Sequence, residues 1–150
     1  MTELPRPLKI DRIGAAGLAF DVAARPEELE PVANRLLLPA VHALSGQYEL
    51  RRLSGGTVQA EGVLQARVEQ ICVLTLEPFT ADVTERFTVH FVPAEREEPE
   101  PEPDAIDQIP YEGVNIDLGE ALIEQLALAL DPYPRRPGAI LPEWLTSSAN

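Results

Sequence analysis

Apolar and polar positions alternate with a period of two through the middle of the chain, which is the pattern of β-strands. Residues 47–53, 58–76 and 82–92 show this alternation, and Gly55-Gly56 supplies a hairpin turn between the first two. Alternate residues share one face of a strand. The shared face of the second segment comprises Val58, Ala60, Gly62, Leu64, Ala66, Val68, Gln70 and Cys72. The three segments predict an antiparallel meander.

Two further segments at the start of the chain have strand character, and one position in the meander is irregular. Residues 8–13 and 18–23 alternate over a few positions and predict short strands. Gly62, inside the long segment, predicts a bulge or a bend.

Helical spacing of apolar residues predicts two helices, over residues 26–37 and 118–130. The first opens with Pro26, which suits the first helical position, and acidic residues follow in the first turn, where the helix dipole favours them. The second opens with Asp117 and Glu120, which have the spacing of a capping box with aspartate as the N-cap. Its remaining residues are apolar on most sides, so it is either largely buried or covers a sheet and also faces a partner.

The pattern therefore predicts an α+β fold. We expect an antiparallel sheet, a meander or one curled into a partial barrel, packed by the two helices. With 150 residues the chain suits a single domain, residues 1–150. Within it, residues 94–107 carry acids and prolines with almost nothing to bury, which predicts a flexible loop.

Charge narrows the classes of partner. Twelve basic residues stand against 25 acidic ones, a formal net charge of −13. Nucleic-acid backbones are bound mainly through Lys and Arg, so we expect a basic protein partner and only indirect contact with RNA. No apolar run reaches the roughly 18 residues of a membrane span, and the N-terminal sequence lacks the apolar core of a secretory signal. A single cysteine fits the reducing cytoplasm.

The residues that could carry chemistry are few, and they predict neither a cofactor nor a metal site. Cys72 lies among apolar residues, which predicts a buried, inert thiol with a raised pKa. His42 and His90 are well separated and form no Cys/His metal spacing. Glu77, before Pro78, is a candidate for a charge-assisted contact with a neighbouring loop. We therefore expect a protein that is not an enzyme.

Six arginines could in principle form a basic surface for RNA. They are Arg51, Arg52, Arg67, Arg86, Arg135 and Arg136. Arg51 and Arg52 are adjacent on a strand and should point to opposite faces. Arg135-Arg136, after the second helix, is a local basic spot in an acidic chain and the best candidate for a phosphate contact.

Several stretches taken together resemble the YceD family of large ribosomal RNA subunit accumulation proteins, which has bacterial and chloroplast members. The matching stretches are Val58-Gln59-Ala60-Glu61-Gly62-Val63-Leu64-Gln65-Ala66, Gln70, Cys72, Leu76-Glu77-Pro78-Phe79, Ile116-Asp117-Leu118-Gly119-Glu120, Leu126-Ala127-Leu128 and Pro132-Tyr133-Pro134-Arg135. The resemblance extends over about residues 8–140. The Glu77-Pro78-Phe79 stretch and the start of the second helix at residues 116–120 are specific together.

The resemblance implies a role in the synthesis, processing or stability of 23S ribosomal RNA, and so in large-subunit assembly. It brings no catalytic residues with it. Many family members have Cys-x-x-Cys where this chain has Cys72 and Thr75, and one thiolate cannot form a structural zinc site. Glu77, Pro78, Phe79, Arg135 and Arg136 are the candidates for contact with a partner or with RNA. A direct RNA-binding module with clustered arginines and an enzyme with an unrecognised site stay open as alternatives.

Overall fold

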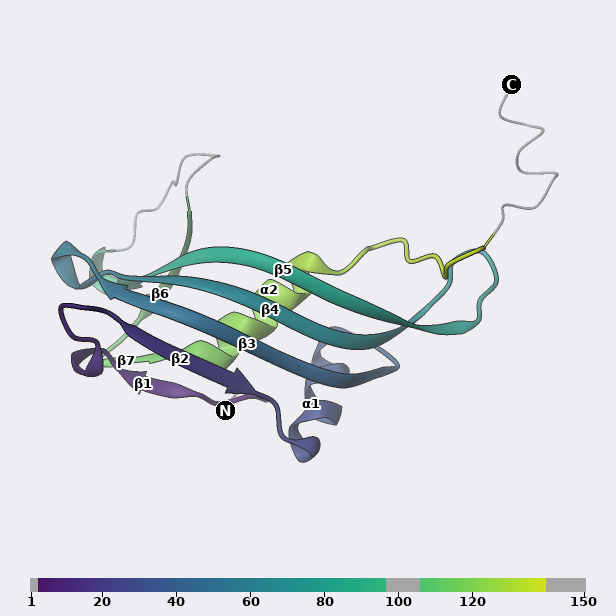
Figure 1. The fold of residues 1–150 in the computed structure, drawn as a ribbon, viewed down its shortest axis with the longest axis horizontal. Coiled ribbons are helices and arrows are strands. Elements are labelled where there is room, and N and C mark those ends of the chain that lie inside the picture. Colours follow the sequence, from purple (N-terminus) through teal and green to yellow (C-terminus); the bar gives the residue numbers. More distant parts are fainter. Residues whose placement is uncertain (1–2, 97–105, 140–150) are drawn as a thin grey trace, which may run out of the picture.

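The structure, a computed structural model, describes residues 3–96 and 106–139. An open five-stranded sheet forms its body, with the strand order β2-β3-β4-β5-β6 (Figure 1). Its strands are β2 (Leu18–Ala23), β3 (Ala40–Arg52), β4 (Val58–Ile71), β5 (Pro78–Pro93) and β6 (Asp107–Tyr111). A small second sheet pairs β1 (Pro7–Lys9) with β7 (Asn115–Asp117), and the helices are α1 (Pro26–Leu36) and α2 (Leu118–Ala129). Single 3-10 turns occur at Ile10–Arg12, Ser54–Gly56 and Ala94–Arg96.

The predicted α+β class is confirmed. Strands β2 to β5 run antiparallel to their neighbours, and the predicted meander corresponds to β3, β4 and β5. The sheet does not close into a barrel within the described residues, because β2 and β6 are its two edges. Strand β6 pairs with the end of β5 in parallel, so residues 94–106 make the long connection that a parallel pair requires.

Four strands differ in their bounds from the predictions, and one of them, β5, extends over Pro78–Pro93 instead of residues 82–92. The long strand ends at Ile71 rather than at residue 76, and a turn follows it. The strand predicted from residue 47 begins seven residues earlier, at Ala40, because a register shift between Val41 and Ala43 breaks the alternation there. The predicted strand over residues 8–13 is only β1, followed by a 3-10 turn. The strand over residues 18–23 and the hairpin turn at Gly55-Gly56 are confirmed.

Gly62 does not mark a bulge, since β4 keeps a continuous register with both neighbours. Instead the ring of Phe87 covers it, and a Cβ at this position would lie 2.5 Å from a carbon of that ring. Tyr48, the cross-strand partner of Gly62 on β3, meets Phe87 edge-on with ring centroids 5.6 Å apart. The missing side chain therefore makes room for an aromatic pair.

Helix α2 lies across one face of the sheet, behind it in Figure 1, and encloses the core. Its buried residues are Leu118, Gly119, Ala121, Leu122, Ile123 and Leu126. The predicted alternation of β4 is confirmed, since Val58, Ala60, Leu64, Ala66 and Val68 all face this core. The Tyr48 hydroxyl donates a hydrogen bond of 2.8 Å to the buried carbonyl of Leu118, which fixes the start of α2 against β3.

The ends of the two predicted helices are close to the observed ones. Helix α1 stops at Leu36, and Leu37 follows in the left-handed conformation. Helix α2 stops at Ala129 with Leu130 as its C-cap. The predicted flexible loop over residues 94–107 lies mostly outside the described residues. Its described ends are a 3-10 turn at Ala94–Arg96 and the start of β6 at Asp107.

Candidate functional site

The turn between β4 and β5 contains Cys72 and Glu77, and its backbone is held by hydrogen bonds. The Cys72 amide donates to the Glu77 carbonyl at 2.9 Å, and the Leu76 amide donates to the Cys72 carbonyl at 2.8 Å. Leu76 has a φ of 61° and a side chain that is 76% exposed. Thr75 accepts a hydrogen bond from the Glu77 amide through its hydroxyl. The carboxylate of Glu77 makes no hydrogen bond or ion pair with a described residue, so its backbone is what shapes the turn.

Cys72 is fully buried, as its apolar surroundings predict, but the predicted direction of its pKa shift is wrong. Burial alone would raise the pKa of the Cys72 thiol. Hydrogen bonds from the Thr75 hydroxyl and from the backbone amides of Arg136, Thr75 and Leu74 outweigh burial and lower this pKa to about 7. The turn and Arg136, from the segment after α2, therefore surround the sulfur with donors that stabilise a thiolate.

The segment after α2 joins this turn. The Val73 amide donates to the Pro134 carbonyl at 2.9 Å. The Gln70 side chain donates to the Asp131 carbonyl at 3.4 Å. The structure thus brings together two of the predicted site regions, the β4–β5 turn and Arg135-Arg136, which are some 60 residues apart in sequence. Arg135 is exposed and Arg136 is half-buried.

Apolar side chains remain exposed around this junction. Ile71, Val73, Leu76 and Tyr133 are between 42% and 76% exposed. Next to them a groove of about 310 Å³ runs between β5 and the segment after α2. Phe79, Ala81 and Val83 line it on the strand side, and Ala129, Leu130 and Pro134 line it on the other side.

The other predicted cluster, Asp117 to Glu120, lies at the opposite end of α2. Asp117 is the N-cap as predicted, because its Oδ1 accepts from the amides of Gly119 and Glu120 at 3.0 and 3.1 Å. Glu120 does not complete the predicted capping box. Its carboxylate pairs instead with Arg35 on α1, which also contacts Glu3. These residues therefore hold the two helices and the N-terminus together.

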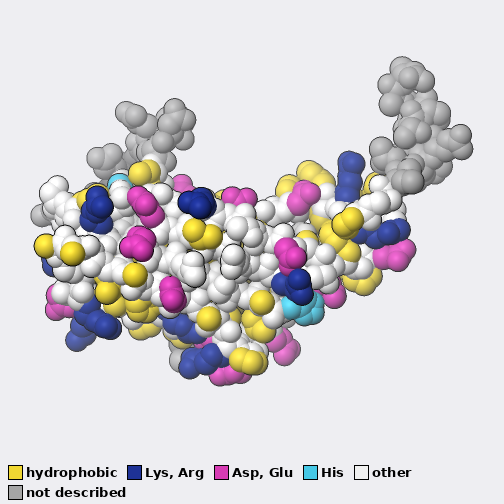
Figure 2. Space-filling model, in the orientation of Figure 1, with side chains coloured by type: hydrophobic (Ala, Val, Ile, Leu, Met, Phe, Trp, Pro, Cys, Tyr) yellow, Lys and Arg dark blue, Asp and Glu magenta, His cyan; other side chains and the backbone are white. Residues whose placement is uncertain are grey.

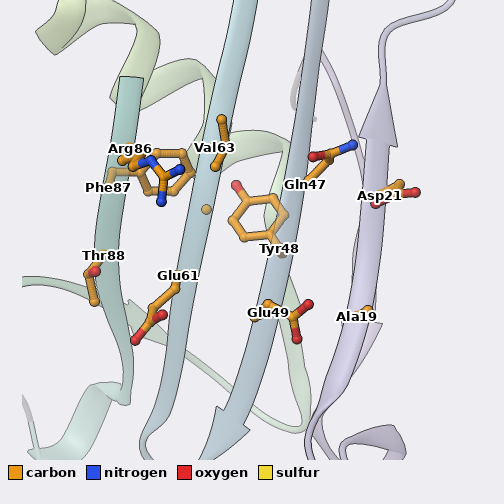
Figure 3. A pocket seen from close by; sticks show the side chains of 11 residues that line it. Ala19, Asp21, Gln47, Tyr48, Glu49, Glu61, Val63, Arg86, Phe87 and Thr88 are labelled. Atoms are coloured by element: carbon orange, nitrogen blue, oxygen red, sulfur yellow. The ribbon is translucent and has the colours of Figure 1, made fainter. Parts of the chain in front are cut away.

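The outer face of the sheet, opposite α2, has a shallow depression of about 720 Å³ (Figure 3). Its rim carries the carboxylates of Asp21, Glu49 and Glu61, with Arg86 as its one guanidinium. Gln47 and Thr88 add uncharged polar groups. The local charge is therefore negative, which favours a cationic occupant over a phosphate.

The arginines do not gather into one basic surface among the described residues. Figure 2 shows basic side chains interspersed with acidic ones over the face in view. By the strand register Arg51, Arg67 and Arg86 lie on the outer face of the sheet. Arg67 is neutralised by Asp82, with 2.9 Å between Nε and Oδ1. Arg52 faces the other way, as predicted for neighbours on a strand.

The two histidines also lie apart. His42 is on β3 with Nε2 3.7 Å from a carboxylate oxygen of Glu69, and His90 on β5 is 3.1 Å from the amide oxygen of Gln59. In the part of the chain that the structure describes, no three His, Cys, Asp or Glu side chains are placed to hold a metal ion. Nor does a described helix have the length and apolar character needed to cross a membrane.

Comparison with protein families identifies the family of this chain. The family model of the large ribosomal RNA subunit accumulation protein YceD matches residues 60–144, more than half of the 150-residue chain. The chain belongs to the YceD family. No curated protein and no solved structure matches it.

The part matched by the YceD family model contains both ends of α2 and the β4–β5 turn. The resemblance over residues 8–59 lies outside the match. Within the match, Cys72 and Thr75 are the two positions of the turn at which the predicted family pattern has cysteines. In this chain the Thr75 hydroxyl hydrogen-bonds to Cys72.

One tightly bonded cluster, around Arg6 and Glu28, has no counterpart in the sequence pattern. The guanidinium of Arg6 donates to both carboxylate oxygens of Glu28, at 2.6 and 2.9 Å, and to the Ala23 carbonyl. The Arg6 amide donates to Asp117. Hydrogen bonds from Arg6 lower the pKa of Glu28 to about 2. Glu28 is one of the acidic residues in the first turn of α1, and its partner, 22 residues away, gives no local signal in the sequence.

Proposed function

We propose that this protein is a non-enzymatic factor in the accumulation of 23S ribosomal RNA, and so in biogenesis of the large ribosomal subunit. It acts in the cytoplasm through a basic ribosomal or ribosome-assembly protein. Membership of the YceD family is the observation that carries the proposal. The family description gives a role in large-subunit ribosomal RNA accumulation, and the choice of partner comes from the charges of this chain.

The charges favour contact through a protein rather than through bare RNA. The net charge is −13, and the carboxylates of Asp21, Glu49 and Glu61 surround the depression on the outer sheet face. Ribosomal proteins are basic because they bind RNA phosphates, and their unneutralised Lys and Arg residues are natural partners for such a surface. Direct RNA binding would need the arginines on one surface, whereas Arg67 is paired with Asp82 and Arg52 faces away from Arg51.

The proposal includes no catalysis. Among the residues that the structure describes, Cys72 is a possible nucleophile because the pKa of its thiol is lowered. Its side chain, however, is fully buried. Its hydrogen-bonding partners are the Thr75 hydroxyl and backbone amides rather than a general base. Such a thiolate is stabilised by the turn and has no access to a substrate.

Loss of the gene and capture of partners test the proposal together. A strain lacking the protein should have a lower ratio of 23S to 16S ribosomal RNA, and the tagged protein should retain large-subunit proteins from a lysate after nuclease treatment. An unchanged RNA ratio would overturn the role in 23S accumulation. Loss of all ribosomal proteins after nuclease treatment would overturn the protein-mediated mode.

A binding titration with 23S ribosomal RNA fragments separates the two modes of contact. We expect weak binding at physiological salt. Tight binding with a steep salt dependence would show direct phosphate contacts. In that case Arg135→Ala should weaken binding more than Arg51→Ala, which removes the same charge from an exposed arginine elsewhere on the surface.

A further inference from the structure

Strand β5 is much longer than the strand that covers its outer edge. It extends over Pro78–Pro93, but β6 pairs only with Val89–Pro93. No described residue pairs with the remaining edge of β5, residues 78–88. In Figure 1 this is the upper edge of the sheet, where β5 continues well beyond β6. A free edge of this length is a template for an added strand.

The register shows which backbone groups this edge offers. The Cys72 amide donates to the Glu77 carbonyl, so Cys72 and Glu77 form a hydrogen-bonded pair at the end of the β4–β5 hairpin. Such pairs alternate along an antiparallel ladder with pairs whose N–H and C=O groups point outward. Continuing the alternation along the observed register places the outward groups on Thr80, Asp82, Thr84 and Arg86. These four residues are hereafter the free edge of β5, and all four side chains are exposed.

The groove described above lies directly beside this edge. Its wall on the β5 side is formed by Phe79, Ala81 and Val83, which are only half-buried. The opposite wall is the segment after α2, which is tied to β4 by a hydrogen bond from Gln70 and to the β4–β5 turn by one from Val73. An added strand would place alternate side chains in this apolar groove and the others over the outer face.

Charge decides the kind of strand that fits. The groove is also lined by Asp82, Glu85 and Asp131, against the single guanidinium of Arg135. Asp82 shares its charge with Arg67, which leaves Glu85 and Asp131 without an ion pair among the described residues. A second copy of this chain would bring another edge of the same composition and a further net charge of −13. A basic segment brings neither a second acidic edge nor a further negative charge, so these carboxylates attract it instead of repelling it.

We propose that the free edge of β5 accepts an extended, basic segment of a protein as an added β-strand, with apolar side chains of that segment in the neighbouring groove. The inference deepens the proposed function, because it rests on a basic protein partner and names where and how that partner binds. Main-chain hydrogen bonds supply affinity, and the groove and its carboxylates select apolar and basic side chains.

A synthetic peptide of alternating lysine and valine, about eight residues long to match the edge, tests this mode directly. Backbone amide exchange measured by NMR on the intact protein should slow at Thr80, Asp82, Thr84 and Arg86 when the peptide binds. The same peptide with alternate backbone nitrogens methylated, and a glutamate–valine peptide, should bind at least about tenfold more weakly. Binding of the lysine–valine peptide without slower exchange at these amides would overturn the proposal.

Proline substitution provides a matched pair of variants. Thr84→Pro removes an outward N–H and leaves the ladder with β4 intact, so the fold should persist and the dissociation constant should rise about tenfold. Ala19→Pro is the control, because Ala19 is exposed on the opposite edge strand and its N–H also points outward in the observed register. Equal affinity of the two variants would refute strand addition at β5. If Thr84→Pro loses its far-UV circular dichroism signal, Glu85→Lys is tested in its place. This variant leaves the backbone groups of the free edge of β5 unchanged and should still lose peptide binding.

The outcomes separate this inference from the proposed function. Peptide binding at the edge together with normal 23S ribosomal RNA in cells carrying Thr84→Pro would uphold strand addition and count against its role in RNA accumulation. A reduced RNA ratio in the deletion strain, with no peptide binding at the edge, would uphold the function and overturn the docking mode. Protein dimers in ultracentrifugation that Thr84→Pro dissolves would show that a second copy occupies the edge, which also overturns the proposal.

Discussion

Replacement of Gly119 by alanine tests how the N-terminal segment is held on α2. Gly119 is in the first turn of the helix, and a Cβ there would lie 1.7 Å from the backbone oxygen of Leu4. Helix propensity alone favours alanine over glycine by about 1 kcal/mol. The contact with a backbone atom predicts the opposite sign, since the segment around Leu4 must move by about 1.5 Å or more to reach an ordinary van der Waals separation.

The size of the loss follows from what this movement disrupts. Leu4 is fully buried, and burial of a leucine side chain contributes about 2 kcal/mol. The displaced segment also carries two hydrogen bonds of 3.1 Å, from the Leu118 amide to the Arg6 carbonyl and from the Arg6 amide to Asp117. Each contributes about 1 kcal/mol. After the gain in helix propensity, Gly119→Ala should lower the free energy of unfolding by about 3 kcal/mol.

Urea unfolding followed by far-UV circular dichroism measures this difference. Gly14→Ala is the matched control, because no atom lies within 4 Å of a Cβ at that position and its φ is not positive. The control should change the free energy of unfolding by less than about 0.5 kcal/mol. If Gly119→Ala were as stable as the unaltered protein, the close contact between α2 and the N-terminal segment would be refuted.

Three further outcomes are expected. Glu28→Gln should lower the free energy of unfolding by about 2 to 3 kcal/mol at pH 7, because Arg6 holds the pKa of Glu28 at about 2. That stabilisation is complete above the ordinary glutamate pKa and is lost as the pH falls toward about 2. Urea titrations should therefore show the difference in free energy of unfolding between the two proteins shrinking between about pH 5 and pH 2. A difference that stays constant over this range would contradict the reasoning. Tyr48→Phe should cost about 1 to 2 kcal/mol in thermal unfolding, since the buried Leu118 carbonyl loses its donor, and an unchanged midpoint would count against that bond. The ultraviolet absorbance of the Cys72 thiolate should titrate with a midpoint near pH 7, and Thr75→Val should raise this midpoint. A midpoint of about 8.5 in the unaltered protein, that of an ordinary thiol, would refute the reasoning.

Periodicity predicted those elements whose apolar residues are buried. The alternating face of β4 and the apolar stripe of α2 have their predicted roles because both line the same core. The end of β4 could not be predicted in this way. Val73 and Leu76 continue an apolar run in the sequence, but both are exposed in a turn, and Leu76 adopts a positive φ that usually indicates glycine.

The candidate site depends on contacts that no local pattern contains. The resemblance to the YceD family singled out Cys72 and Arg135, but it did not show that the segment after α2 donates an amide to the cysteine sulfur. The free edge of β5 was also invisible, because the alternation of a strand does not reveal where its neighbour ends. Only the register of β6 against Val89–Pro93 exposes it.

The pairing of β1 with β7 has a consequence for synthesis of the chain. Pro7 lies opposite Asp117 in this small sheet, so residues that pair in the finished fold are synthesised 110 positions apart. Leu4 and Leu8 are fully buried in the finished protein, yet α2, which covers them, begins only at Leu118. Contacts so distant in sequence slow folding. Leu4 and Leu8 are therefore synthesised long before the residues that cover them, and we expect this segment to be among the last parts of the fold to form.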